Sequence, residues 1–395
     1  MDAEEARTIG RRLRQIRHAR GKSLRVVAGL AGMSKSHLQR IERGERALDS
    51  RSQTAALANA LDIAPSELNS LPVPAPGNGH TDTAIEAVRL ALMAVSCNRP
   101  GGKVVPVEEL RARVEALHPG SGRDLKQVGA ALPALIRDLH STMAAGRNVA
   151  KLLDLAVLLH AQDSRGWLWI HSAPLDLRWQ AASLAQRMAQ ERDTPTAMGV
   201  ATWGAVVEML AGGAFGLAQD ELDAVRVPTT SSESTQLDGM LALSRSLVAA
   251  SDNRTGDVQA PLEYAAELAE RTGQGNAYWM GFGPVNVGLW RIAATLEVGD
   301  YERAATIAEG LNPEEHPSRE RQATYWADYG RTLARLGGRR DDAVMAFRRA
   351  EVLYPTRVQR NPFAREVLAE LLAHSRRDAV GRELRGMAYR AGLPV

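Results

Sequence analysis

Cysteine is almost absent from this sequence of 395 residues, since Cys97 is the only one. A disulfide within one chain is therefore excluded, and we expect no cysteine-based zinc site within one chain. Aromatic residues make up only 5% while alanine, leucine and arginine dominate, which favours helices over sheets. No run of about 18 uncharged apolar residues occurs, so we expect no membrane span. The first residues carry charges but no apolar core of a secretory signal, which predicts a cytoplasmic location.

Motifs of common catalytic sites are also missing. We find no GxxxxGK[ST], no HExxH, no GxSxG and no GxGxxG that opens a helix. The nine histidines are scattered, and we expect His160 and His171 on the surface or in the core rather than on a metal. The sequence therefore predicts no enzyme activity, no cofactor and no metal site.

Positive charge is concentrated at one end of the chain. Residues 1–46 hold 12 Lys/Arg and 5 Asp/Glu, a net +7, while the rest of the chain carries a net −4. This asymmetry favours a polyanion as the partner of the first segment alone. Charge by itself leaves a second interpretation open, a solvated arginine-rich helix.

Five short helices are predicted within residues 1–71. The first runs from Ala3 to Arg20 and stops at Gly21, and Ser23 and Ser34 are placed to cap the second and third. The other four are expected at residues 24–31, 35–43, 52–61 and 66–71.

The spacing within AGLAGMSKSHLQRI predicts two helices joined by a tight turn. Ala28 is small enough for the helices to cross closely, and Gly32 tolerates the positive φ of the turn. The positions expected to face inward are Val27, Ala31, Met33, Leu38 and Ile41. The opposite face of the third helix carries Lys35, Ser36, Gln39, Arg40 and Arg43. Such a polar face is what readout of base edges in the major groove requires.

These residues resemble the Cro/CI-type, or XRE, helix-turn-helix family. The resemblance rests on Ala28, Ala31-Gly32-Met33-Ser34, Leu38 and Ile41-Glu42-Arg43-Gly44. It implies base contacts by Lys35, Ser36, Gln39 and Arg40. It also implies a structural pair between Arg17 and Glu42.

One position departs from that family. Many relatives carry a phosphate-binding glutamine where this chain has Leu24, so the backbone contacts are expected from Ser23, Arg25 or the helix N-terminus, and from Arg43. A helix-turn-helix kept only as a protein-binding module is the alternative, and the arginine-rich charge argues against it.

Residues 72–81, PVPAPGNGHT, predict a semi-extended linker between a domain of residues 1–71 and a domain of residues 82–395. Beyond it the sequence predicts helix after helix, with no convincing strand. Glycines between the predicted helices recur at intervals of 43, 43 and 39 residues, at Gly213, Gly256, Gly299 and Gly338. The predicted pairs are 196–212 with 214–225, 233–251 with 256–272, 283–298 with 301–311, 318–337 with 341–354, and 363–375 with 379–391.

Two segments, LEVGDYERAATIAEGL and ARLGGRRDDAVMAFRRAEVLYP, look like units of the tetratricopeptide-repeat family, although the units exceed its norm of about 34 residues. The predicted fold is therefore all-α, a five-helix Cro/CI-type helix-turn-helix domain followed by a tetratricopeptide-like α-solenoid. A solenoid offers a concave binding face. Amides and aromatics gather in one stretch that we expect to bind an effector, at Asn276, Tyr278, Trp279, Asn286 and Trp290. The alternative is that the tryptophans are core and the asparagines cap or turn.

Together these patterns predict a dimeric, sequence-specific transcription regulator. Its partners are expected to be double-stranded DNA with a palindromic operator, a second copy of the chain, and a peptide or small-molecule effector. The domain order is similar to that of peptide-sensing quorum regulators of Gram-positive bacteria. The alternative is a protein-interaction scaffold or antitoxin-like adaptor without a diffusible effector.

Overall fold

The structure is a computed structural model that describes residues 9–69, 79–117, 124–375 and 378–393. The described residues are helical without a strand, which confirms the all-α prediction. No described helix is both long and apolar enough to cross a membrane. The predicted helical residues 3–8 and 70–71 and most of the predicted linker lie outside the described residues. Helix α6 begins at Gly79, so the last three residues of the predicted linker are helical.

We call residues 9–69 the head. Its helices are α1 (Ile9–Ala19), α2 (Leu24–Leu30), α3 (Lys35–Glu42), α4 (Arg51–Leu61) and α5 (Pro65–Asn69). They enclose a small core of aliphatic side chains that includes Leu13, Leu38 and Leu57, each fully buried. The apolar side of α3, with Leu38 and Ile41, faces this core.

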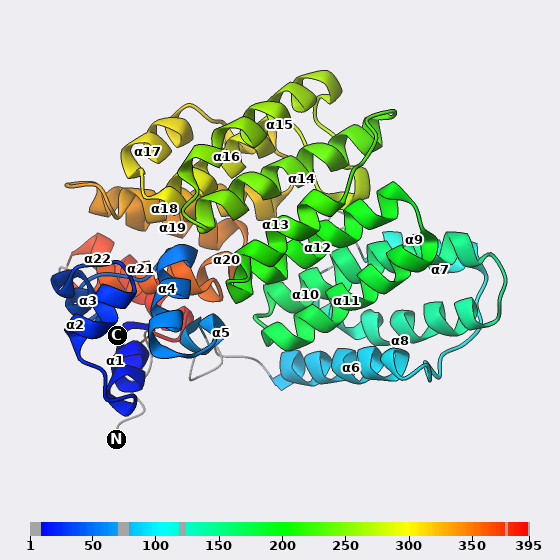
Figure 1. The fold of residues 1–395 in the computed structure, drawn as a ribbon, viewed down its shortest axis with the longest axis horizontal. Coiled ribbons are helices and arrows are strands. Elements are labelled where there is room, and N and C mark those ends of the chain that lie inside the picture. Colours follow the sequence, from blue (N-terminus) through cyan, green and yellow to red (C-terminus); the bar gives the residue numbers. More distant parts are fainter. Residues whose placement is uncertain (1–8, 70–78, 118–123, 376–377, 394–395) are drawn as a thin grey trace.

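The remaining described residues form the body, an array of helices in which successive helices pack together (Figure 1). Its first half contains α6 (Gly79–Ser96), α7 (Val107–Glu115), α8 (Leu125–Ala144), α9 (Val149–Leu158), α10 (Arg165–Ile170) and α11 (Leu175–Arg192). Its second half contains α12 (Pro195–Gly212), α13 (Phe215–Ala224), α14 (Ser232–Ser251), α15 (Gln259–Thr272), α16 (Pro284–Val298), α17 (Tyr301–Glu309), α18 (Arg319–Leu333), α19 (Arg340–Leu353), α20 (Thr356–Gln359), α21 (Pro362–Ala373) and α22 (Ala379–Arg390).

The predicted helix pairs correspond to α12–α13, α14–α15, α16–α17, α18–α19 and α21–α22, with ends shifted by a few residues. Gly213 and Gly299 end α12 and α16 with φ of 72° and 88°, the left-handed conformation that favours glycine. Asp300 caps α17 by accepting from the Arg303 N–H, and Ala304 is fully buried, as close packing of neighbouring helices requires. A helical array is thus present, and its likeness to tetratricopeptide repeats stays a prediction.

A π-helical turn at Leu159–Ser164 joins α9 to α10 and places His160 in the body core, next to His140 of α8. The Nε2 atoms of His140 and His160 lie 2.8 Å apart, and His160 is fully buried. Burial lowers the pKa of His140 to about 4 and that of His160 well below its usual range. We call these two residues the histidine pair. His160 is therefore a core residue, one of the two places expected for it.

Helices far apart in the sequence meet at one side of the molecule. The head lies against α21 and α22, close to the C-terminal end of the chain (Figure 1). Ile9 of α1, for example, is hydrogen-bonded to Glu366 of α21, 357 positions later. The chain therefore brings its first and last helices together.

Candidate DNA-binding interface

The turn between α2 and α3 has the geometry that its sequence requires. Gly32 adopts a φ of 67°, and the Met33 N–H that follows donates to Ala28 O at 2.9 Å. Ser34 then caps α3 by accepting from the His37 N–H at 3.1 Å. Ala28 is 1% exposed and belongs to the head core. The turn thus fixes α3 at a defined angle to α2.

The outer side of α3 is open to solvent. Lys35, Ser36 and Arg40 are exposed and Gln39 is half-buried, whereas Leu38 and Ile41 on the other side are buried in the head core. All four residues predicted to contact bases therefore share one accessible polar face. Lysine and arginine donate to guanine, and glutamine pairs with adenine, so this face has the chemistry of base recognition.

The residues predicted to contact the DNA backbone also lie at the surface. Ser23 is exposed and caps α2 by accepting from the Val26 N–H at 3.3 Å, which leaves its own proton available to an acceptor. Arg25 is exposed at the start of α2. Arg43, just beyond α3, lies 3.7 Å from Glu45 in an exposed ion pair, which restrains it weakly.

Arg17 and Glu42 form a buried ion pair with two hydrogen bonds between α1 and the end of α3. Nε and Nη2 of Arg17 donate to the two carboxylate oxygens of Glu42 at 2.6 and 2.7 Å. Their side chains are only 8% and 4% exposed, and the hydrogen bond to Glu42 raises the pKa of Arg17. This pair connects α1 to the end of α3, so its place in the head is structural.

Gly10 of α1 is a residue that the sequence analysis missed. A Cβ at this position would lie 2.0 Å from the Ile41 carbonyl oxygen, which no real contact tolerates. The backbones of α1 and α3 therefore touch where Gly10 lies. A glycine inside a predicted helix, on the side of its apolar stripe, was the available signal.

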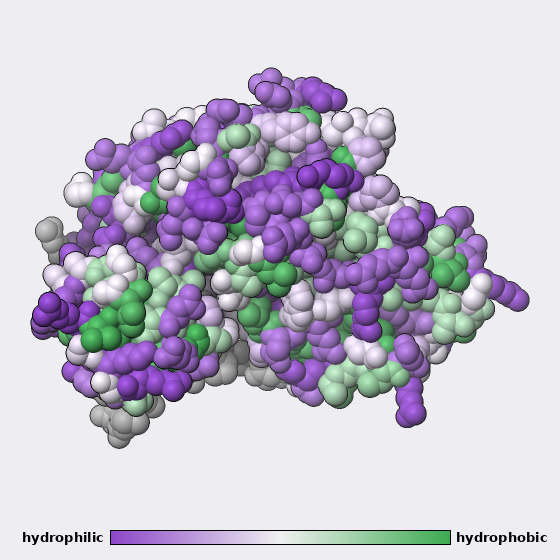
Figure 2. Space-filling view, in the orientation of Figure 1, coloured by the Kyte–Doolittle hydropathy of each residue, from purple (hydrophilic) through white to green (hydrophobic). Residues whose placement is uncertain are grey.

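The visible face of the head also has an apolar patch (Figure 2). Val26 and Leu30 of α2 are 49% and 64% exposed, one helical turn apart. They lie on the helix before α3, and the body leaves them uncovered.

The stretch predicted to bind an effector is paired within the chain. The Asn286 side chain is fully buried, accepts from Arg321 Nη2 at 2.5 Å and donates to the Met240 sulfur at 3.5 Å. Asn276 is exposed, and its Oδ1 accepts from the Gly281 N–H at 3.1 Å within its own turn. Both amides thus have partners within the chain, and an effector site at this stretch stays a prediction.

The aromatic residues of that stretch pack against the body. Tyr278 and Trp279 are half-buried with φ of 51° and 60°, an uncommon conformation for bulky side chains. Tyr278 and Trp290 contact the core cluster of the second half, and Trp279 contacts that of the first half. The stretch thus connects the two halves of the body.

No set of three or more histidine, cysteine or acidic residues in the described part of the chain is arranged to hold a metal ion.

Comparison with known proteins identifies the head. A family model described as a helix-turn-helix domain matches residues 8–71. No curated protein and no solved structure matches the chain. The match covers the five helices, the turn and the reading face described above. The head is therefore a helix-turn-helix domain.

Proposed function

We propose that this protein is a sequence-specific transcription regulator that binds double-stranded DNA through α3. One observation carries the proposal. The polar face of α3, with Lys35, Ser36 and Arg40, is open while the apolar face and the Arg17–Glu42 pair are buried. A module kept only to bind protein has no need for this arrangement, because surface cations on a reading helix serve an anionic partner.

This function also favours a dimer. One head reads only a few base pairs, which is too little for specificity in a genome. Two heads about 34 Å apart on a palindromic operator supply the missing contacts. We therefore propose a two-fold homodimer held by the body, the larger part of the chain. Ultracentrifugation of the protein alone and on DNA tests this, and a monomer under both conditions contradicts it.

The base contacts are tested by selecting bound fragments from random DNA and sequencing them. On the selected site, Lys35→Ala and Arg40→Ala should each cost about 1–3 kcal/mol and relax the sequence preference. Arg43→Ala should weaken binding to selected and random DNA alike, because a phosphate contact carries no sequence information.

The matched control is Arg111→Ala, which removes an exposed arginine of α7 in the body. It should leave DNA affinity unchanged. Equal losses on selected and random DNA for Lys35→Ala and Arg40→Ala would contradict the assigned roles. A protein that retains no fragment above background would contradict the function itself.

A further inference from the structure

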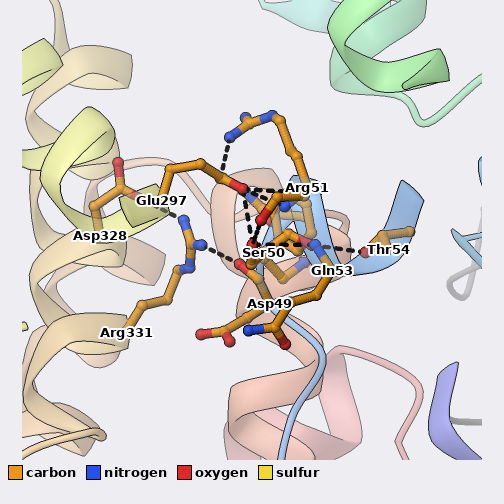
Figure 3. Close-up of polar contacts among 11 residues, drawn as sticks. Asp49, Ser50, Arg51, Gln53, Thr54, Glu297, Asp328 and Arg331 are labelled. Carbon is orange, nitrogen blue, oxygen red and sulfur yellow. Dashed lines mark hydrogen bonds and ion pairs between the residues drawn. The ribbon is translucent and has the colours of Figure 1, made fainter. Parts of the chain in front are cut away.

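Ala55 of α4 and Pro65 of α5 lie against Gly213 at the end of α12. The head is also attached to the body by a compact set of polar contacts, which we call the dock, and Figure 3 shows its part around Asp49, Arg51 and Glu297. On the head it consists of Ile9, Ala47 and residues 49–52, and on the body of Glu297, Arg331, Arg335, Glu366 and Glu370.

Glu297 of α16 caps the N-terminus of α4. Its Oε1 accepts from the backbone N–H groups of Arg51 and Ser52, the latter at 3.2 Å, and its Oε2 accepts from Arg51 Nη1 at 2.9 Å. The Glu297 side chain is 1% exposed. The first N–H groups of a helix have no partner within it, and the helix dipole favours negative charge there. A carboxylate of the body therefore satisfies donors that the head leaves open.

Two more body carboxylates make the same kind of contact. Glu366 of α21 accepts from the Ile9 N–H at 2.9 Å, and Glu370, one turn later, accepts from the Ala47 N–H at 2.8 Å. Both of these N–H groups belong to the head backbone. Three separate segments of the head are thus each held by one body carboxylate.

Two arginines of the body complete the dock around Asp49. Arg331 donates to the Asp49 carbonyl oxygen at 2.6 Å. Arg335, whose side chain is fully buried, lies 3.0 Å from the Asp49 carboxylate and 2.5 Å from Glu370. The dock thus contains opposite charges in contact, and the side chains of Glu297 and Arg335 at its centre are buried. Breaking it would leave buried charges without partners, so it restrains the head far more than exposed ion pairs do.

The dock leaves the reading face open. It covers the start of α1, the loop before α4 and the N-terminus of α4, while Lys35 and Ser36 stay exposed. Arg40 is also exposed, at the edge of a hollow that it lines with Glu370 of the body. A contact that silenced the head would be expected to cover this face. The docked arrangement is therefore compatible with DNA binding, and it determines the direction in which α3 points from the body.

We propose that Glu297, Glu366 and Glu370 are positioning residues that fix the head on the body in the form that binds DNA. The body then sets the distance and orientation between the two reading helices of a dimer. This inference rests on the proposed function, but its first test does not require DNA.

The first test measures the distance between head and body by electron spin resonance. Cys97 is exposed and is the only natural cysteine, so one spin label binds there, and Asn59→Cys on the exposed side of α4 takes the second. Labelled chains are mixed with excess unlabelled chains to suppress distances between copies. The labelled Asn59→Cys chain, the parent of this test, should give one narrow distance distribution. Adding Glu297→Ala or Glu370→Ala to it should broaden that distribution.

Glu302→Ala, which removes an exposed carboxylate of the neighbouring helix α17, is the matched control and should keep the distribution narrow. Circular dichroism of each variant reports whether the helices remain folded, and Glu297→Gln, which keeps an acceptor oxygen, serves if Glu297→Ala unfolds. A broad distribution in the parent, or a narrow one in all folded dock variants, would overturn the proposal.

The second test uses the DNA site selected by the parent protein, as one half-site and as paired half-sites with varied spacing. The parent should prefer one spacing. Glu297→Ala should bind a single half-site with the affinity of the parent. It should lose about tenfold or more affinity for the best-spaced pair and accept other spacings, because a head that is free to turn on the body lowers the effective concentration of the second head at its half-site. Tighter binding of Glu297→Ala to a single half-site would show that the dock inhibits, and would overturn the proposal. If the parent binds no DNA, the proposed function fails while the distance measurement still decides on the dock.

Discussion

The Arg17–Glu42 pair allows a sharp prediction on the stability of the head. Arg17→Met removes the cation and leaves the Glu42 carboxylate, 4% exposed, without its partner. Removing one member of a buried ion pair typically costs about 3–5 kcal/mol. A unit the size of the head, residues 9–69, has a stability of about 3–9 kcal/mol at 0.05–0.15 kcal/mol per residue. The variant should therefore lose much of the head's stability.

The measurement must report on the head alone. All seven tryptophans lie in the body, so intrinsic fluorescence follows the body, while amide hydrogen exchange in peptides from α3 follows the head. Arg17→Met should accelerate exchange in α3 and leave the fluorescence-detected unfolding of the body nearly unchanged. The double variant Arg17→Met/Glu42→Leu should recover most of the protection, because an apolar pair leaves no buried charge. A loss below about 1 kcal/mol in the single variant, the value of an exposed pair, would refute the reasoning.

Three further results are expected. Gly10→Ala should destabilise the head by about 1–3 kcal/mol through the clash with the Ile41 carbonyl oxygen, as measured by amide exchange in α3. Gly29→Ala, with open space around its Cβ, should not, and equal effects of the two variants would contradict the close approach of α1 and α3. Burial raises the pKa of Glu366 from 4.5 to about 7, so the parent should lose stability as the pH rises through this interval. In urea unfolding, Glu366→Gln should be more stable than the parent by about 3 kcal/mol at pH 8 but not at pH 4.5, and a stability difference that does not change with pH would exclude this cause. Because the pKa of His140 is lowered from 6.5 to about 4, the body should lose stability as the pH falls through this interval. Replacing both members of the histidine pair by glutamine should reduce that loss in unfolding followed by tryptophan fluorescence, and an unchanged dependence of stability on pH would show that the pair is not its cause.

Local patterns in the sequence were sufficient to predict the head. The helix ends follow from residues within one turn, such as the caps Ser23 and Ser34 and the positive φ of Gly32. The outward face of α3 follows from helical periodicity alone, since Leu38 and Ile41 fix which side is buried. The same reasoning predicted the helix pairs of the body, because helix breakers are local signals.

Contacts between distant residues could not be predicted in this way. The Asn286 amide is paired because Arg321, 35 positions later, reaches it, and nothing near Asn286 in the sequence indicates this. Glu297 lies 246 positions from Arg51, so no periodicity relates the two. The dock therefore required the structure, as did the histidine pair and the close approach at Gly10.

The dock joins segments that are made at different times during synthesis. The head is complete once residue 69 has left the ribosome, but Glu366 and Glu370 follow about 300 residues later, which takes roughly 15–60 s at 5–20 residues per second. Until Glu297 has been made, the α4 N-terminus has no carboxylate partner from the body, and Ile9 and Ala47 wait longer still for Glu366 and Glu370. A chain that stopped before α21 would keep its reading helix and lose two of the three carboxylates that aim it. Under the proposed function, the direction in which α3 meets DNA therefore depends on residues made long after α3 itself.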